Sequence, residues 1–275
     1  MKIDIALGQY CEGNSPLHRL DPRAKLIMSI LFIVAIFMAK NVFAFLFLIL
    51  FSVALAAVSK VSPRVVLRGL KPILFIAAFT AVINLFFVRG EQLIFEFGFV
   101  KIYLEGIINA VLIVVRIIIL LAASSMLLTY TTTPLALTDG LEQLLSPLAK
   151  LKIPVHDFSM MMTIALRFIP TLVEETEKIM NAQKARGADF TSGNIMKRVK
   201  ALVPIIIPLF VSAFRRANEL AVAMECRCYT GGEGRTRMNK LHAGMRDLFG
   251  ILIVIAAGVV IVLINRVNFG FSLVM

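Results

Sequence analysis

Two arginines lie beside small residues in a part of the chain that is rich in helix-ending signals. The first is central in Ala185-Arg186-Gly187 and the second in Cys226-Arg227-Cys228. A guanidinium presents several donors in a planar fork, so it can bind a carboxylate through two hydrogen bonds, which a lysine cannot do. Small neighbours allow the backbone of a partner to approach. The repeated pattern favours docking of two similar partners, one at each arginine.

An ordinary helix C-cap is the alternative interpretation of both triplets. Glycine commonly follows the last residue of a helix, and a cation near the C-terminal end of the helix dipole contributes about 0.3–1 kcal/mol. The triplets are compatible with both readings, and the repetition is what favours docking.

Residues 129–247 supply the helices that must position these arginines, because apolar residues recur there at helical spacing among charges. Asp157 is the expected N-cap of the middle helix and Gly187 its expected terminator. Two prolines, Pro204 and Pro208, are expected to bend the last helix. The cap and breaker residues predict helices from Pro134 (after Thr131–Thr133) to about Leu151, from Phe158 to Arg186, and from about Asn194 to Cys228.

The rest of the chain is too apolar for a water-soluble domain. Of its 275 residues 59% are hydrophobic and the mean hydropathy is +0.87, whereas soluble domains contain about 45–50% apolar residues. The sequence predicts an all-α integral membrane protein with about five transmembrane helices plus long amphipathic cytoplasmic helices. The domains are then 1–128 with four spans, 129–247 as the cytoplasmic and interface domain, and 248–275 with the last span. The apolar runs near the roughly 20-residue spanning length are Leu26–Ala39, Val42–Val58, Ile73–Val88, Ile107–Leu128 and Leu248–Ile264.

Charge gives an expected orientation. The chain carries 29 Lys+Arg and a formal net charge of +12, and cations accumulate in cytoplasmic loops. With the N-terminus cytoplasmic and the C-terminus extracellular, few cations fall in outer segments: Lys40, Arg89, Lys101 and Arg266. Nucleic-acid binding would explain the charge but not the apolar runs. The expected location is a cell membrane, and an ordinary cytosolic enzyme is excluded.

Five motifs together resemble one family, the transmembrane T component of energy-coupling factor (ECF) ABC transporters. The resemblance covers most of the chain. The motifs are Asn14-Ser15-Pro16-Leu17-His18-Arg19-Leu20-Asp21-Pro22-Arg23-Ala24-Lys25, Leu166-Arg167-Phe168-Ile169-Pro170, Ala182-Gln183-Lys184-Ala185-Arg186-Gly187-Ala188, Arg215-Arg216-Ala217 and Met224 through Gly231.

The resemblance implies a transmembrane coupling scaffold that transmits ATP-driven motion from two ATPases to a membrane substrate-binding (S) subunit for vitamin or micronutrient uptake. Its partners are then two ABC-type ATPase subunits (EcfA and EcfA'), a small S component and the lipid bilayer, without nucleic acid. Arg186 and Arg227 become ATPase-docking residues at the ends of two crossed coupling helices. Cys226 and Cys228 depart from the family pattern, which has Ala and Gly there. Termination of the second helix then falls to Cys228 or to Gly231.

Catalytic, metal and cofactor sites are not expected. The sequence has no Gly-x-x-x-x-Gly-Lys-Ser/Thr phosphate loop, so ATP hydrolysis must come from partner chains. The Cys and His residues lie on scattered segments, although Cys226 and Cys228 are close, and a structural zinc needs four such ligands. Glu174-Glu175 fits the solvated face of an amphipathic helix better than a protease site. The protein is therefore predicted to be a non-catalytic subunit.

Two further features have open roles. Arg116 is the only charge within an expected span, and it either packs or snorkels, or contacts a partner membrane subunit. Met160-Met161-Met162 is either core or an adaptable contact with the S subunit. The alternative function, a self-sufficient secondary transporter or channel, would need polar groups at mid-membrane, and the spans offer few.

Overall fold

The computed structural model describes residues 10–11, 13–88, 93–97, 100–151, 154–188, 190, 194–231 and 243–266. The chain divides into two compact units, one made of residues 1–144 and 241–275 and the other of residues 145–240. The first unit therefore combines the two apolar ends of the chain, while the second is a continuous stretch between them.

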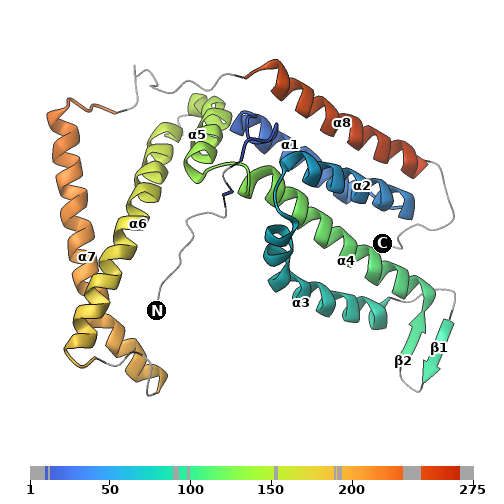
Figure 1. Cartoon of the computed structure of the whole chain (residues 1–275), viewed down its shortest axis with the longest axis horizontal. Helices are drawn as coiled ribbons and strands as arrows, with labels where there is room; N and C mark the ends of the chain where they lie inside the picture. Colours follow the sequence, from blue (N-terminus) through green and yellow to red (C-terminus); the bar gives the residue numbers. More distant parts are fainter. Residues whose placement is uncertain are drawn as a thin grey trace. The chain divides into compact units, whose positions relative to one another are not determined.

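The first unit is helical where the apolar runs predicted spans. Four of its helices are long and apolar enough to cross a membrane, namely α2, α3, α4 with its η1 extension, and α8. At 17 residues, α1 is a shorter fifth helix that packs among them. The elements are α1 (Pro22–Met38), α2 (Val42–Ser59), α3 (Pro63–Phe87), α4 (Leu104–Ser124), the π-helical turn η1 (Ser125–Thr129), α5 (Pro134–Leu145) and α8 (Met245–Arg266) (Figure 1).

Local capping chemistry sets two of these helix starts. The carboxylate of Asp21 accepts a hydrogen bond from the backbone N–H of Arg23 at 2.9 Å, and Pro22 occupies the first turn of α1. The hydroxyl of Thr133 accepts from the N–H of Ala136 at 3.3 Å before α5 begins. The predicted hydroxyl cap ahead of Pro134 is confirmed. Both pairs follow the preference for an oxygen-bearing N-cap followed by proline.

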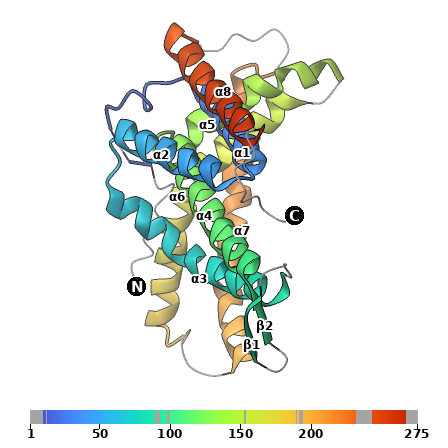
Figure 2. The ribbon, with the colours of Figure 1, turned by 90° about the vertical axis from the view of Figure 1, so that its right-hand side faces the viewer.

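A short β-hairpin joins α3 to α4, where the sequence analysis predicted an all-α fold and no strand. Strands β1 (Leu93–Phe97) and β2 (Val100–Tyr103) pair antiparallel, with Phe97 opposite Val100. Figure 2 shows the hairpin next to the adjoining ends of the two helices. Aromatic and β-branched residues favour extended backbone, and the antiparallel pairing satisfies the backbone groups that a loop would leave open.

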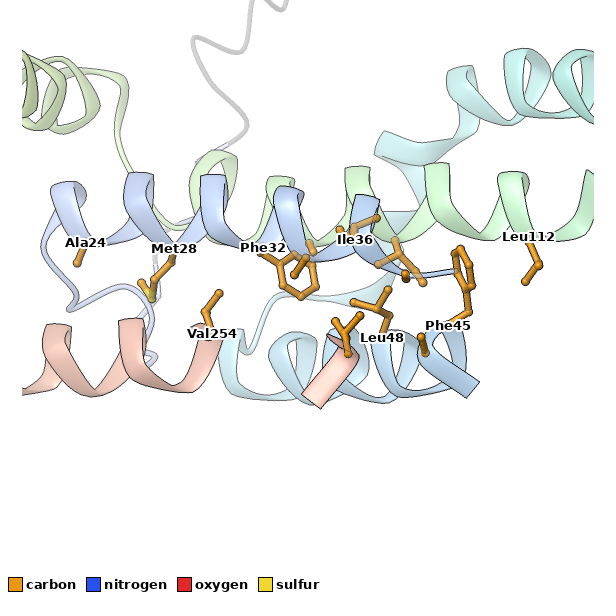
Figure 3. Packing of buried hydrophobic residues seen from close by; sticks show 14 residues of the cluster. Ala24, Met28, Phe32, Ile36, Phe45, Leu48, Leu112 and Val254 are labelled. Carbon is orange, nitrogen blue, oxygen red and sulfur yellow. The ribbon is translucent and has the colours of Figure 1, made fainter. Parts of the chain in front are cut away.

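The core of the first unit forms around one face of α1. Met28, Phe32 and Ile36 recur every four residues and are buried, so they lie on one side of the helix. They gather with Leu48 of α2 and Val254 of α8 (Figure 3). The large apolar side chains on the outward faces of α2, α3 and α8 stay exposed, as expected where the surrounding solvent is hydrocarbon.

A buried polar cluster joins the start of α1 to two distant segments. Lys25 is 1% exposed, and its Nζ donates to the carbonyl of Thr131 at 2.8 Å and to the hydroxyl of Thr132 at 3.1 Å. The carboxylate of Asp247 accepts from the N–H of Asp21 at 2.8 Å. Burial lowers the pKa of Lys25 to about 8, although the nearby charges of Asp247 and Asp21 act in the opposite direction. The residues from Asp21 to Lys25 thereby tie α1 to the segment before α5 and to α8.

The second unit consists of η2 (Ser146–Leu151), α6 (Val155–Ala185) and α7 (Ile195–Cys226). The long helices α6 and α7 pack against each other and cross (Figure 1). An ion pair holds this crossing, because Nη2 of Arg216 lies 2.7 Å from Oε2 of Glu175. The residues predicted to form the two long helices therefore form one crossed pair of helices.

Several predicted boundaries shift. The helix predicted to reach Leu151 ends at Leu145, and a 3-10 helix that contains Pro147 follows it. Proline has no backbone N–H to donate, so the α-helical hydrogen-bond pattern stops there. The next helix begins at Val155, so Asp157 lies in its first turn and Pro154 takes the cap position. Prolines Pro204 and Pro208 lie within α7, which continues through both. Residues 152–153, 189, 191–193 and 232–234, which include predicted breakers, lie outside the described residues.

Candidate functional site

The end of α6 places Arg186 at a defined position in a Schellman motif. Arg186 is the C-cap residue and Gly187 follows it in the left-handed region with φ +87°. The N–H of Gly187 donates to the carbonyl of Lys184 at 2.9 Å, and the N–H of Ala188 donates to that of Gln183 at 3.0 Å. These two bonds satisfy carbonyls that a helix end leaves open.

The end of α7 repeats this geometry at Arg227. The N–H of Cys228 donates to the carbonyl of Glu225 at 2.9 Å, and the N–H of Tyr229 donates to that of Met224 at 3.0 Å. Cys228 has φ 57° and takes the place that Gly187 has at the other end. The two arginines therefore occupy equivalent positions of the same motif, one at the end of each long helix.

Cys228, and not Gly231, terminates α7. Gly231 also has a positive φ, +102°, but it lies three residues further along the chain, outside the cap bonds. A side chain in the left-handed region costs roughly 1–2 kcal/mol because Cβ crowds the following carbonyl. The α7 end thus adopts the glycine-type cap despite carrying a cysteine.

We expect Cys228→Gly to stabilise the end of α7 by about 0.5–1 kcal/mol, since relief of the left-handed strain exceeds the extra freedom that glycine gains on unfolding. Gly187→Ala should do the opposite at α6. Hydrogen exchange of the amides of residues 228 and 229, which donate the cap bonds of α7, should slow in the first variant. Exchange of the amides of residues 187 and 188, which donate those of α6, should quicken in the second. Unchanged exchange in both variants would contradict the assigned cap.

Both arginine ends are open to a partner. Ala185, Arg186, Gly187, Cys226, Arg227 and Cys228 are all exposed, and a Cβ placed on Gly187 would meet no atom within 4 Å. Within the described part of the chain, neither Arg186 nor Arg227 has an ion pair or a side-chain hydrogen bond. Figure 1 shows the two ends at separate places on the crossed pair. Each end therefore presents a guanidinium that is not engaged by the described residues.

The methionine triplet lies far from Arg186 along the same helix. Met160 is half-buried, whereas Met161 is 59% and Met162 41% exposed. At 1.5 Å per residue, Met162 and Arg186 are roughly 36 Å apart along α6. Contact of the triplet with an S subunit remains a prediction.

The exposed apolar surface of the second unit is larger than the methionine triplet suggested. On α7 the exposed side chains include Ile206, Ile207, Phe210 and Phe214, with Phe210 at 62%. The signal in the sequence was the apolar stretch around the two prolines of α7. The site predicted from the sequence did not include this stretch.

Arg116 has partners inside the first unit. Its Nη2 donates to the carbonyl of Ala39 at 2.8 Å, next to the end of α1. Its guanidinium carbon lies 5.3 Å from the ring centre of Phe45 and 6.0 Å from that of Phe37, within the range of cation–π attraction. These contacts join α4 to the turn between α1 and α2, and contact of Arg116 with an S subunit remains a prediction.

Metal-site geometry is not found in the described residues, where no group of three or more His, Cys, Asp or Glu side chains could hold an ion. The charged groups at the two helix ends are the exposed guanidinium groups of Arg186 and Arg227. These features define the class: an α-helical integral membrane protein in which an apolar bundle is followed by two long crossed helices with matched arginine caps.

Comparison with known proteins identifies the family. The family model described as CbiQ, cobalt transport protein, matches residues 13–238. A relative from Brevibacillus brevis is 52% identical over 263 residues, which cover 96% of this chain and 98% of the relative. Relatives from Ruminiclostridium cellulolyticum and Bacillus subtilis are each 50% identical, over 94% of this chain and 97% of theirs. All three are energy-coupling factor transporter transmembrane proteins EcfT.

The chain belongs to this CbiQ family of transporter transmembrane proteins. The resemblance stated from its motifs is confirmed, as is the prediction of a helical membrane protein.

Proposed function

We propose that this protein is the coupling scaffold of an ECF-type transporter. Arg186 and Arg227 each dock into a groove on one of two ABC-type ATPase subunits. Movement of the ATPases then passes along α6 and α7 to a membrane S subunit that captures a vitamin or another micronutrient. The chain itself is non-catalytic, because its sequence lacks a phosphate-binding loop. The names of the relatives, which are transporter transmembrane proteins, support this assignment.

The matched caps are the observation that carries the proposal. A Schellman motif fixes the backbone around each arginine, so the guanidinium projects from a defined helix end and the backbone loses little freedom on binding. The fork can bind a carboxylate through two hydrogen bonds, and its planar shape pre-organises that contact. Two equivalent ends suit two similar partners better than one.

The apolar surfaces of the second unit support contact with a membrane partner. Met161, Met162 and Phe210 expose large apolar area, and methionine side chains re-pack easily against different surfaces. We assign the S-subunit contact to Met160–Met162 together with the apolar stretch of α7. The scaffold lies in the membrane with its N-terminus cytoplasmic and its C-terminus extracellular, because few cations then fall on the outer side.

The native cysteines beside Arg227 provide the test. Cys226 and Cys228 are exposed free thiols, so a maleimide should label both in the isolated chain carrying Cys11→Ser. In the complex with the ATPases, labelling should fall at least tenfold, because the docked groove covers the helix end. Ala185→Cys should report the same protection at the other end.

Lys200→Cys is the matched control for the α7 end, since this exposed residue lies 26 residues before Cys226, roughly 39 Å along the same helix. Its thiol should react equally in the free chain and in the complex. Equal labelling of Cys226 and Cys228 with and without ATPases would refute docking at this end of α7.

A further inference from the structure

A large apolar pocket lies in the first unit, away from the arginine ends. It has a volume of about 860 Å³ and lies between α2, α8 and the segment before α1. One face of α2 contributes Phe51, Ala54, Leu55 and Val58, which recur at helical spacing. Facing it, α8 contributes Phe249 and Ile253 among others. Neither the docking contacts nor the S-subunit contact of the proposed function uses these residues.

The pocket is polar at one end only. Its charged lining residues are Arg19, Lys60 and Arg246, all of them cations and all exposed. They come from the segment before α1, the C-terminal end of α2 and the first turn of α8. In the part of the chain that the structure describes, none of the three makes an ion pair, and Arg19 donates only a 3.4 Å hydrogen bond to Asn14.

Two carboxylates of the described residues adjoin this end in the sequence, and both are already engaged. Asp21 and Asp247 are buried, and each already accepts a hydrogen bond from a backbone N–H, at 2.9 Å and 2.8 Å. They also face the buried ammonium of Lys25. The three exposed cations therefore attract an anion from outside.

The chemistry of the pocket matches one kind of molecule. Its volume lies near the upper end of the range of about 300–1,000 Å³ for small-molecule sites, so an inorganic anion would leave the apolar part empty. Both walls belong to helices long and apolar enough to cross the bilayer, and Phe249 on one wall is 69% exposed. A ligand that enters from the bilayer must be apolar along most of its length and anionic at one end.

We propose that this pocket is a binding site for an anionic phospholipid. An acyl chain lies against the faces of α2 and α8, and the headgroup phosphate lies among Arg19, Lys60 and Arg246. Basic pockets between transmembrane helices are the usual sites for anionic headgroups. The lipid bridges α2 and α8 at the end where the Lys25 cluster joins α1 to α8. Its binding therefore stabilises the first unit.

Lipid titration of the purified full-length chain tests the proposal. After delipidation, dioleoylphosphatidylglycerol and dioleoylphosphatidylcholine are added separately, and native mass spectrometry and the thermal midpoint are recorded. Phosphatidylglycerol should bind at least tenfold more tightly and raise the midpoint. The triple variant Arg19→Gln, Lys60→Gln, Arg246→Gln should bind it roughly a hundredfold more weakly, since each cation near an anionic headgroup contributes about a fivefold factor.

Matched variants separate the pocket from general charge effects. Arg64→Gln, Arg68→Gln and Lys71→Gln remove the same number of exposed cations from α3, outside the pocket, and should leave the preference intact. Ala54→Trp should fill the apolar part and block both lipids, while Ala57→Trp, exposed on the same helix, should block neither. If the triple variant does not fold, the tryptophan pair decides.

Three results would overturn the proposal. The first is a tenfold preference for phosphatidylglycerol that survives in the triple variant. The second is equal lipid binding by the Ala54→Trp and Ala57→Trp variants. The third is a midpoint rise with inorganic phosphate as large as that with phosphatidylglycerol, which would make the site one for a small anion.

Discussion

Replacing both arginines at the helix ends, with Arg186→Glu and Arg227→Glu together, is expected to abolish co-purification of the ATPase subunits. The chain should still insert into the membrane. Loss of an arginine that is a hot spot of an interface costs about 2 kcal/mol or more, which is about thirtyfold in affinity. The two losses of affinity, at separate contacts, multiply to a decrease of roughly a thousandfold. The new carboxylates add repulsion if the grooves are acidic. Uptake should fall with the loss of the complex.

The physical reason for this large effect is that the caps fix the backbone at each arginine and leave its side chain exposed. Neither guanidinium has a partner among the described residues, so reversal breaks no internal contact and should leave the fold unchanged. Each single reversal should weaken co-purification without abolishing it, because the other helix end still docks.

Two controls sharpen this result. Lys178→Glu with Lys200→Glu reverses one exposed charge on each of the same helices, eight residues before Arg186 and 27 residues before Arg227, and should retain the ATPases. Arg186→Lys with Arg227→Lys keeps the charge but loses the fork, so an intermediate loss would identify bidentate recognition. Retention of both ATPases and of uptake by the double glutamate variant would show that the docking assignment is wrong.

The buried ammonium of Lys25 is expected to make the stability of the first unit rise with pH. Its pKa is lowered from 10.5 to about 8 in the folded chain. Between these values the unfolded chain binds a proton that the folded chain does not, so the free energy of unfolding increases with pH. From pH 7.5 to 9.5 the gain is about 2 kcal/mol, because one pKa unit corresponds to roughly 1.4 kcal/mol.

The thermal midpoint of the wild type should therefore rise by roughly 4–8 °C over this range. Lys25→Met removes the titrating group, and Lys25→Arg keeps a charge that does not titrate below pH 12. Both variants should lack the rise, so the difference between wild type and variant cancels all other titrating groups. A rise of equal size in the three proteins would show that Lys25 does not carry it.

Local patterns in the sequence were sufficient for much of the helical framework. Apolar runs predicted the spans, and Thr133 with Pro134 predicted the start of α5, since a cap hydrogen bond needs only neighbouring residues. Gly187 in the left-handed region followed from the same local rule. The β-hairpin between α3 and α4 was missed because β1 is five residues long and becomes stable only by pairing with β2.

The candidate site divides in the same way. Arg186 and Arg227 could be found from the sequence, because their small neighbours and the helix ends lie within a few residues. The choice between Cys228 and Gly231 as the cap could not be made from the sequence, since a cysteine rarely adopts positive φ and only the cap bonds require it there. The roles of Arg116 and Lys25 also depended on partners distant along the chain, such as Ala39 and Thr131.

The sequence by itself determined a helical membrane protein with two long helices that each end in an arginine, because hydrophobic length, helical periodicity and capping are properties of neighbouring residues. Only the tertiary structure decided that the two ends share one cap geometry, that Lys25 is buried beside Asp247, and that Arg19, Lys60 and Arg246 surround one end of an apolar pocket. These features depend on which helix faces pack together. That choice is made by burial of side chains far apart in the sequence.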